Sequence, residues 1–244
     1  MTFVARMILE TEKLAKSFGS LKVVDAVDLA VAPGEAVGII GPNGAGKTTL
    51  FNLVTGTLKP DSGAVRLDGR DITREPPHVR CIAGISRSFQ IPHPFAKLTV
   101  FENLLVAATQ RGGKKEREVA EECGDILART GLLRAANRLG GSLTLLDRKR
   151  LELARALASR PRVILLDEIA GGLSEGECAA LVETIGAIKS SGVTILWIEH
   201  IVRALTAIVD RLVVLNFGRK IADGKPREVI ASAAVRETYM GIAA

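Results

Sequence analysis

The sequence predicts an α/β protein with a mainly parallel core sheet flanked by helices, a small antiparallel β subdomain and an inserted α-helical subdomain. Three observations predict this class. Short apolar runs alternate with helical patterns, two other regions alternate in polarity between turn pairs, and one long region contains helix signals but no convincing strand. The chain has 244 residues, 47% of them apolar, which is enough to fill the core of one such domain.

The expected core strands are four short runs, AVGII at 36–40, VILLD at 163–167, TILWI at 194–198 and LVVLN at 212–216. Their continuous apolar, β-branched character is typical of strands buried on both faces. Helical patterns follow the first three runs, in GKTTLFNLVTG, SEGECAALVETIGAIKSSG and IVRALTAIV. In the second helix Ser174 and Glu177 form an S-x-x-E capping box, and Gly192 closes the helix. This alternation predicts a parallel sheet.

Two further regions depart from that alternation. Residues 8–35 and 63–70 are broken by the turn sequences PGE, DSG and DGR, which favour a small antiparallel sheet. Residues 97–158 carry only helix signals, so we expect a helical insertion between the first and second core strands. A single domain, 1–244, is thus divided into a core with its antiparallel subdomain, 8–89 and 159–244, and a helical subdomain, 90–158.

Composition narrows the function classes. The net charge of +6 permits binding to nucleic acid or to an anionic membrane surface but does not require it, because Lys and Arg are scattered among 27 acids, and we expect no nucleic-acid partner. No apolar run approaches the ~20 residues that span a bilayer, and the first residues lack a secretory signal pattern, which predicts a soluble, cytosolic chain. The three cysteines are widely spaced, so we expect small buried hydrophobes instead of a disulfide or a zinc site.

The segment GPNGAGKTTL follows the first core strand and satisfies the P-loop pattern G-x-x-x-x-G-K-[ST]. Gly44 and Gly46 allow the backbone amides to curl around phosphate oxygens at a helix N-terminus. Lys47 neutralises phosphate charge, and the Thr48 hydroxyl is a ligand for Mg²⁺. The sequence therefore predicts a P-loop NTPase that binds ATP and Mg²⁺ through Gly41, Pro42, Asn43, Gly44, Ala45, Gly46, Lys47, Thr48 and Thr49.

Acidic and imidazole side chains follow two other core strands. Asp167 ends the strand VILLD and is expected to hold Mg²⁺, while Glu168 is expected to act as general base toward an attacking water. Because α/β sheets bind ligands at the carboxyl ends of their strands, we expect the P-loop and these carboxylates at the ends of adjacent strands. His200 follows the strand TILWI at the same edge and is expected to contact the γ-phosphate; a structural histidine is the alternative.

These motifs carry a family resemblance. The P-loop GPNGAGKTT, Gln90 of SRSFQ, the run ARALASRPRVILLDE and the histidine of IEH resemble the nucleotide-binding subunit of an ABC transporter, over about residues 10–241. More narrowly, GISRSFQIPHPFAKLTVFENLLVAA is similar to the branched-chain amino acid importer ATPases of the LivG type. The resemblance implies the ABC ATPase fold and ATP hydrolysis coupled to transport.

The resemblance also implies individual roles. Phe18 of KSFG matches the aromatic residue on which adenine stacks, with an ordinary core aromatic as the alternative. Gln90 matches the glutamine that touches Mg²⁺ or the attacking water and relays the nucleotide state to the membrane subunit. The run GGLS, 171–174, matches a loop that crosses the dimer interface, although Ser174 stands where an aspartate is frequent.

The family's leucine-serine-glycine-glycine-glutamine signature, which contacts the nucleotide of the other ATPase subunit, is altered in this chain. The five aligned positions are Leu143, Thr144, Leu145, Leu146 and Asp147. Thr144 and Asp147 still read as a T-x-x-D capping pair, but the glycines that allow close backbone approach are absent. An ordinary capped helix start, with Arg148 and Glu152 as an exposed i,i+4 pair, is the alternative.

The altered signature and the resemblance together imply partners. We expect a heterodimer with a second, related ABC ATPase that supplies a normal signature, with a homodimer as the alternative. Membrane-spanning permease subunits, and through them an extracytoplasmic solute-binding protein, would place the chain at the cytoplasmic face of the inner membrane. Alternative functions are a lipid or glycolipid exporter ATPase, a nucleic-acid-associated ABC ATPase and a P-loop kinase, and the set Gln90, Glu168 and His200 argues against the kinase.

Overall fold

The computed structural model describes residues 6–109 and 116–240 and confirms the α/β class. The core strands are β3 (Ala36–Ile40), β6 (Ile85–Ser88), β7 (Val163–Asp167), β8 (Thr194–Ile198), β9 (Arg211–Asn216) and β10 (Arg219–Gly224). A second sheet contains β1 (Leu9–Phe18), β2 (Leu21–Val31), β4 (Ser62–Leu67) and β5 (Arg70–Asp71). The core sheet has the order β10-β9-β3-β8-β7-β6, and the antiparallel second sheet has the order β2-β1-β4-β5.

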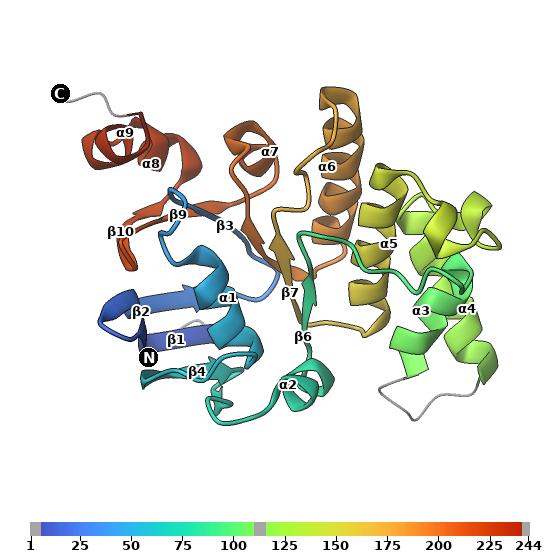
Figure 1. Ribbon diagram of the computed structural model, residues 1–244, viewed down its shortest axis with the longest axis horizontal. Coiled ribbons are helices and arrows are strands. Elements are labelled where there is room, and N and C mark those ends of the chain that lie inside the picture. The colour runs from blue at the N-terminus through green and yellow to red at the C-terminus, as the bar shows by residue number, and fades with distance from the viewer. Residues whose placement is uncertain (1–5, 110–115, 241–244) are drawn as a thin grey trace.

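Helices cover the core sheet and form a separate group at one side of the molecule (Figure 1). They are α1 (Lys47–Thr55), α2 (Pro77–Ala83), α3 (Val100–Thr109), α4 (Glu116–Arg129), α5 (Leu145–Ala158), α6 (Glu175–Ser190), α7 (Val202–Thr206), α8 (Pro226–Ala231) and α9 (Ala233–Met240). Short 3₁₀ turns lie at Leu133–Ala135 and Gly140–Ser142. In Figure 1 the group α3, α4 and α5 lies on the opposite side of the core from the antiparallel sheet, as an inserted helical subdomain should.

The core strands are buried on both faces, as their composition predicts. Every residue of β3, β7 and β8 is buried. Val37 and Ile39 pack into a cluster shared with the antiparallel sheet and α1, whereas Ala36 and Ile40 pack on the other face against α5 and α6. The capping box of α6 is also confirmed, because the Ser174 side chain accepts from the Glu177 backbone and the Glu177 side chain accepts from the Ser174 backbone.

The sequence prediction lacks two core strands, and it is wrong in placing the strands β3 and β7 next to each other. β6 contains Ser86, Arg87 and Ser88, which interrupt the apolar pattern, and β10 is a mostly exposed antiparallel edge strand. Since β6 precedes the helical insertion, the insertion separates the second core strand from the third, not the first from the second. The strand β8 also lies between β3 and β7, because strand order in the sheet does not follow chain order.

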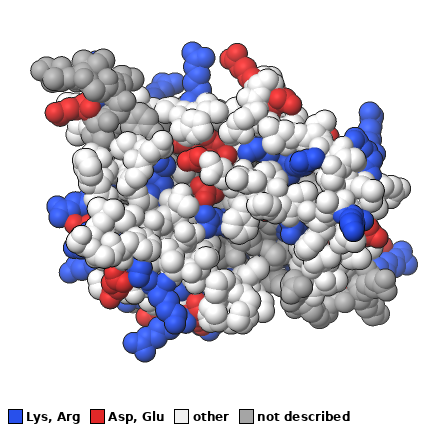
Figure 2. Space-filling view, in the orientation of Figure 1, with Lys and Arg blue, Asp and Glu red and all other residues white. Residues whose placement is uncertain are grey.

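Within residues 6–109 and 116–240, no helix is both long and apolar enough to cross a bilayer. Of the three cysteines, which are all free, Cys123 is buried as expected, while Cys81 and Cys178 are half-buried. Lys and Arg side chains form several separate groups on the face shown in Figure 2, and a small group of acidic side chains lies near its middle.

Candidate functional site

The P-loop connects β3 to α1 and takes a conformation that needs glycine. Residues 41–46 form the loop, and Lys47, Thr48 and Thr49 begin the helix. The backbone φ angles of Gly44 and Gly46 are +81° and +96°. A Cβ on Gly46 would lie 2.3 Å from the carbonyl oxygen of Val23, so only glycine fits there. The loop therefore leads directly into a helix N-terminus, where backbone amides and the helix dipole attract an anion.

The Lys47 ammonium lies inside this loop. Its Nζ donates to the carbonyl oxygens of Gly41 at 2.7 Å and Pro42 at 3.0 Å, and the residue is only 7% exposed. Burial lowers the pKa of Lys47, and the nearby carboxylates of Glu168 and Asp167 oppose that shift. A cation with three donors is thus held against the loop that would cradle phosphate.

Glu168 follows β7 in an uncommon backbone conformation. Its φ is +44°, which is unfavourable for a residue with a side chain, and its backbone N–H donates to the Ile198 carbonyl of β8 at 2.8 Å. The Gln90 side-chain amide donates to the Glu168 carboxylate, with 2.7 Å between Nε2 and Oε2. Such local strain commonly occurs at functional sites. The structure therefore brings together two residues that lie 78 positions apart in the sequence.

Asp167 is buried at the end of β7 and pairs with Arg87 of β6. The Arg87 Nη2 lies 2.5 Å from the Asp167 Oδ2, and the two side chains are 9% and 5% exposed. Arg87 also donates to the Asn52 side chain of α1 at 2.5 Å and packs against the rings of Phe51 and Phe89. Arg87 was not predicted from the sequence, because a charged residue in the middle of ISRS gave no strand signal. Two features of the sequence could have identified Arg87: the neutral residues Ser86 and Ser88 on either side of it, and its position three residues before Gln90.

His200 lies two residues after the end of β8, at the same edge of the sheet as the P-loop. Its side chain is 59% exposed, and its expected contact with the γ-phosphate stays a prediction. The preceding Glu199 is fully buried, and its carboxylate accepts from the backbone N–H groups of Ala170 and His200 at 2.8 and 3.0 Å. The Nδ1 of His200 lies 3.5 Å from the Glu199 Oε2. Glu199, which the sequence analysis also missed, thus ties the His200 turn to the segment after Glu168.

Phe18 ends β1 and is half exposed, so the alternative of an ordinary core aromatic is wrong. The Lys16 ammonium lies 5.9 Å from its ring centroid. An exposed ring at a strand end is available for stacking by a flat base. No contact within the described residues links Phe18 to Asp167 or Glu168, so its role stays a prediction.

The altered signature positions lie at the start of α5. Thr144 is the N-cap, and its hydroxyl accepts from the Asp147 backbone N–H at 3.2 Å. The Asp147 carboxylate does not complete a capping box but lies 3.8 Å from Arg150. Leu143 is buried, Leu146 is partly buried, and Leu145 is 43% exposed. The predicted cap by Thr144 is therefore confirmed, whereas the predicted return contact of the Asp147 carboxylate is not.

The exposed Arg148–Glu152 pair, which belonged to the alternative of an ordinary helix start, is wrong. Glu152 is buried and pairs with Arg155, with 3.1 Å between Oε2 and Nη1. Arg148 donates to the Gly141 carbonyl instead, at 2.9 Å. Position 152 faces inward because the segment after Gln90 packs on that side of α5, which spacing within the helix could not reveal.

The donor set suits a magnesium ion that is shared with a nucleotide. Mg²⁺ prefers oxygen ligands and is usually held by one or two carboxylates together with phosphates and water. Thr48 and Asp167 offer a hydroxyl and a carboxylate beside the P-loop, and the Gln90 amide lies at the neighbouring carboxylate of Glu168. The residues present therefore fit Mg²⁺.

Comparison with known proteins agrees with this arrangement. A family model described as "ABC transporter" matches residues 24–171. The chain belongs to the ABC transporter family. It is an ABC ATPase with the fold that the sequence predicts.

Similar proteins span nearly the whole of this ABC ATPase. It is 38% identical to the high-affinity branched-chain amino acid transport ATP-binding protein BraF of Pseudomonas aeruginosa, over 98% of this chain and 99% of BraF. It is 36% identical to the lipopolysaccharide export system ATP-binding protein LptB of Haemophilus influenzae, over 96% and 97% of the two chains. A solved ADP conformation of an ATP-binding cassette of an ABC transporter superposes with a TM-score of 0.88 at 35% identity, covering 97% of this chain and 99% of that one.

Proposed function

We propose that this ABC ATPase hydrolyses ATP to energise import of branched-chain or related amino acids through a membrane permease. The observation that carries the proposal is the meeting of the P-loop, Lys47, Glu168 and Gln90 at the carboxyl edge of one sheet, with His200 at the end of the strand between β3 and β7. The substrate class rests on the 38% identity to BraF over nearly the full length of both chains.

The proposed mechanism assigns a task to each residue. The P-loop amides and Lys47 bind the phosphates, and Phe18 stacks on the adenine. Glu168 accepts a proton from the attacking water, and Gln90 holds that carboxylate in position through the 2.7 Å hydrogen bond. When bound, Mg²⁺ neutralises charge on the phosphate oxygens, and Thr48, Gln90 and Asp167 would hold it.

His200 has a separate task in this proposal. Its exposed imidazole reaches toward the γ-phosphate, and Glu199 orients it from the buried side. Because the γ-phosphate distinguishes ATP from ADP, contacts to that group favour the closed dimer before hydrolysis and release it afterwards.

The altered signature supports a heterodimer with a second ABC ATPase. Leu145 and Leu146 replace small residues at the α5 N-terminus, so an approaching triphosphate would meet side chains where glycine would leave room. This chain's own P-loop, Glu168 and His200 keep the expected residues and would work with a normal signature from the partner. A homodimer remains the alternative assembly.

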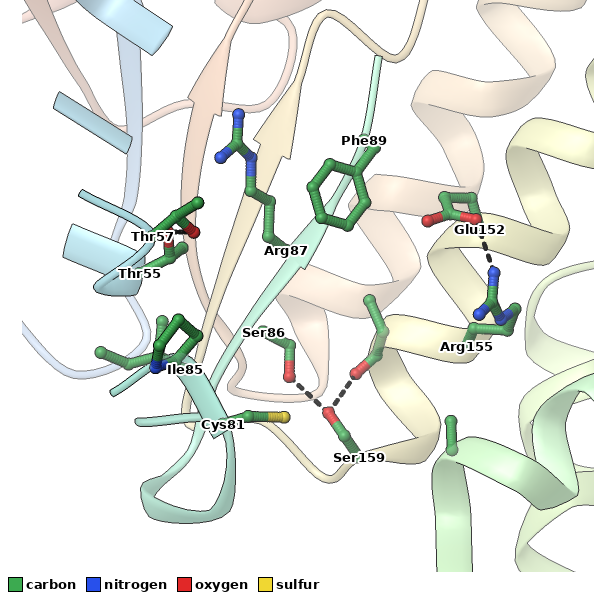
Figure 3. Close-up of a pocket in the computed structure, with 13 residues that line it drawn as sticks. Thr55, Thr57, Cys81, Ile85, Ser86, Arg87, Phe89, Glu152, Arg155 and Ser159 are labelled. Atoms are coloured by element: carbon green, nitrogen blue, oxygen red, sulfur yellow. Dashed lines mark hydrogen bonds and ion pairs between the residues drawn. The ribbon is translucent and has the colours of Figure 1, made fainter. Parts of the chain in front are cut away.

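A groove between the core and the helical subdomain supports the proposed permease contact. Figure 3 shows it between β6 with the following Phe89 on one side, and α5 with its C-cap Ser159 on the other; Arg87 lies on β6, and Glu152 and Arg155 lie on α5. Its cavity has a volume of about 290 Å³. The exposed apolar residues Ile82 and Ile91 lie close to it along the chain. A permease helix seated there would hold the ATPase at the cytoplasmic face of the membrane, with a solute-binding protein on the other side.

Reconstitution tests the proposal. The chain is assembled with its permease and partner ATPase in proteoliposomes, and ATP hydrolysis and uptake of labelled leucine are measured. Glu168→Gln should bind ATP but lose hydrolysis and uptake, because the amide cannot accept the proton. Asp125→Asn, an acidic-to-amide change on α4 outside the site, is the matched control and should keep both. Strong hydrolysis by the isolated homodimer would contradict the heterodimer.

A lipid or glycolipid exporter is the second candidate, because the identity to LptB is nearly as high. The same proteoliposomes distinguish the two. ATP-dependent extraction of a labelled glycolipid, without stimulation of hydrolysis by a solute-binding protein and leucine, would favour the exporter.

A further inference from the structure

Three side chains on one face of α5 hold the segment that follows Gln90. Lys149, Glu152 and Arg155 are spaced three residues apart and therefore point to the same side of the helix. The Lys149 Nζ donates to the Gln90 carbonyl at 3.2 Å, and the Arg155 Nη1 donates to the His93 carbonyl at 3.0 Å. The Glu152 carboxylate accepts from the His93 backbone. We call these three residues the α5 clamp.

Glu152 is the central member of the α5 clamp. Its side chain is 8% exposed, and its Oε2 lies 3.1 Å from the Arg155 Nη1, the contact dashed in Figure 3. Burial raises the pKa of Glu152, while Arg155 and the His93 backbone oppose that shift. The Arg155 guanidinium also packs 4.9 Å from the Phe95 ring centroid. Because a buried carboxylate is costly unless it is paired, Glu152 favours the arrangement in which all these contacts are made.

The same segment is bound to the rest of the helical subdomain. The Phe95 backbone exchanges two hydrogen bonds with the Asn103 side chain of α3, at 2.8 and 3.1 Å. A Cβ on Gly140 would lie 3.1 Å from the Phe95 carbonyl oxygen, and one on Gly141 would lie 3.1 Å from that of Ala96. Residues 91–96 are thus packed against both α3 and the turn just before the signature positions 143–147.

The preceding residues belong to the core instead. Phe89 packs against Arg87, which pairs with Asp167, and the Gln90 side chain bonds to Glu168. Core contacts therefore end at the Gln90 side chain, and helical-subdomain contacts begin at the Gln90 carbonyl. The change from core contacts to helical-subdomain contacts therefore occurs at Phe89–Gln90, at the boundary proposed between the core and helical subdomains.

We propose that Glu152 and Arg155 are positioning residues that make residues 91–96 and α5 move as one body. A shift of Gln90 on nucleotide binding then moves the α5 N-terminus, so the chain's own nucleotide changes how the altered signature meets the partner's nucleotide. This inference rests on the proposed function, because it requires nucleotide at the P-loop. Without the α5 clamp, Gln90 would still respond to nucleotide, but α5 would not follow.

Hydrogen–deuterium exchange with mass spectrometry tests this on the full chain, with Mg²⁺ and a non-hydrolysable ATP analogue. In the wild type, the analogue should change exchange in both peptides 90–98 and 144–150. In Glu152→Gln, the change at 90–98 should persist and the change at 144–150 should fall at least threefold, while the dissociation constant of the analogue stays within twofold. The amide keeps the volume of the carboxylate but loses the charge that binds Arg155 and the His93 N–H.

Glu121→Gln is the matched control, because Glu121 pairs with Arg117 at 2.9 Å on α4, within the helical subdomain and away from the α5 clamp. It should behave as the wild type. An unchanged response at 144–150 in Glu152→Gln, or an equal loss in the control, would overturn the inference. Arg155→Lys, which keeps the charge but shortens the reach to His93, is the second variant if Glu152→Gln unfolds, with the same expected loss. A wild-type chain that ignores the analogue would instead refute the proposed function.

Discussion

Arg87→Met tests whether the buried ion pair behind the site is structural. The substitution removes a guanidinium that binds the Asp167 carboxylate at 2.5 Å and the Asn52 side chain at 2.5 Å. Methionine keeps much of the apolar stem, which packs against the rings of Phe51 and Phe89. The main consequence is therefore a buried carboxylate without its cation.

The expected loss follows from burial. Removing one member of a buried pair costs about 3–5 kcal/mol, because the remaining charge stays away from water. Arg87 and Asp167 are 9% and 5% exposed, so solvent gives little relief. For a domain of this size, each kcal/mol shifts the melting temperature by about 2–4 °C, so the variant should melt about 6–20 °C below the wild type. Arg87→Met with Asp167→Asn should recover part of that loss, since no unpaired charge remains.

Calorimetry and urea titration measure these values, with Arg66→Met as the matched control. Arg66 pairs with Glu12 at 2.7 Å, but the two side chains are 39% and 57% exposed. Exposed pairs contribute little, because water screens both charges, so this control should melt within a few degrees of the wild type. A loss below about 1 kcal/mol for Arg87→Met, or equal losses in the two variants, would refute the reasoning.

Three further changes probe the P-loop and the helix cap. Burial lowers the pKa of Lys47 in the fold, so its charge reduces stability at neutral pH. Lys47→Met should therefore unfold at no lower urea concentration than the wild type at pH 7, and its advantage in stability should shrink as pH rises toward 10.5. A calorimetric scan of the variant with ATP should show no nucleotide-induced rise in melting temperature. A marked fall in stability of Lys47→Met would contradict this account of the Lys47 charge. Gly46→Ala should weaken ATP binding about tenfold or more, measured by isothermal titration, because its Cβ would lie 2.3 Å from the Val23 carbonyl; near-normal affinity would contradict the loop geometry. Ser174→Ala should lower the free energy of unfolding by about 1 kcal/mol in urea titration, because the capping box with Glu177 is lost.

Local patterns were sufficient for most elements and for the nucleotide loop. The strands at 36–40, 163–167 and 194–198 have the predicted bounds, because a strand buried on both faces must be apolar throughout. The capping box at Ser174 and the N-cap at Thr144 involve residues three apart, so sequence spacing contains their geometry. The strand β6 escaped prediction because its polar Arg87 is satisfied by Asp167, a partner 80 positions away.

The sequence by itself determined which residues we propose to meet ATP. The P-loop, Asp167, Glu168 and His200 each stand at the end of an apolar run, and the carboxyl ends of parallel strands share one edge. Only the tertiary structure decided which charged side chains support these residues. Arg87 pairs with Asp167, the Glu199 carboxylate accepts from the His200 backbone, and Glu152 lies inward toward His93 instead of outward toward Arg148. The physical reason is that these charges are buried. A buried charge must find its partner in space, and the partner comes from whichever segment the fold packs against it, at a distance along the chain that no local pattern records.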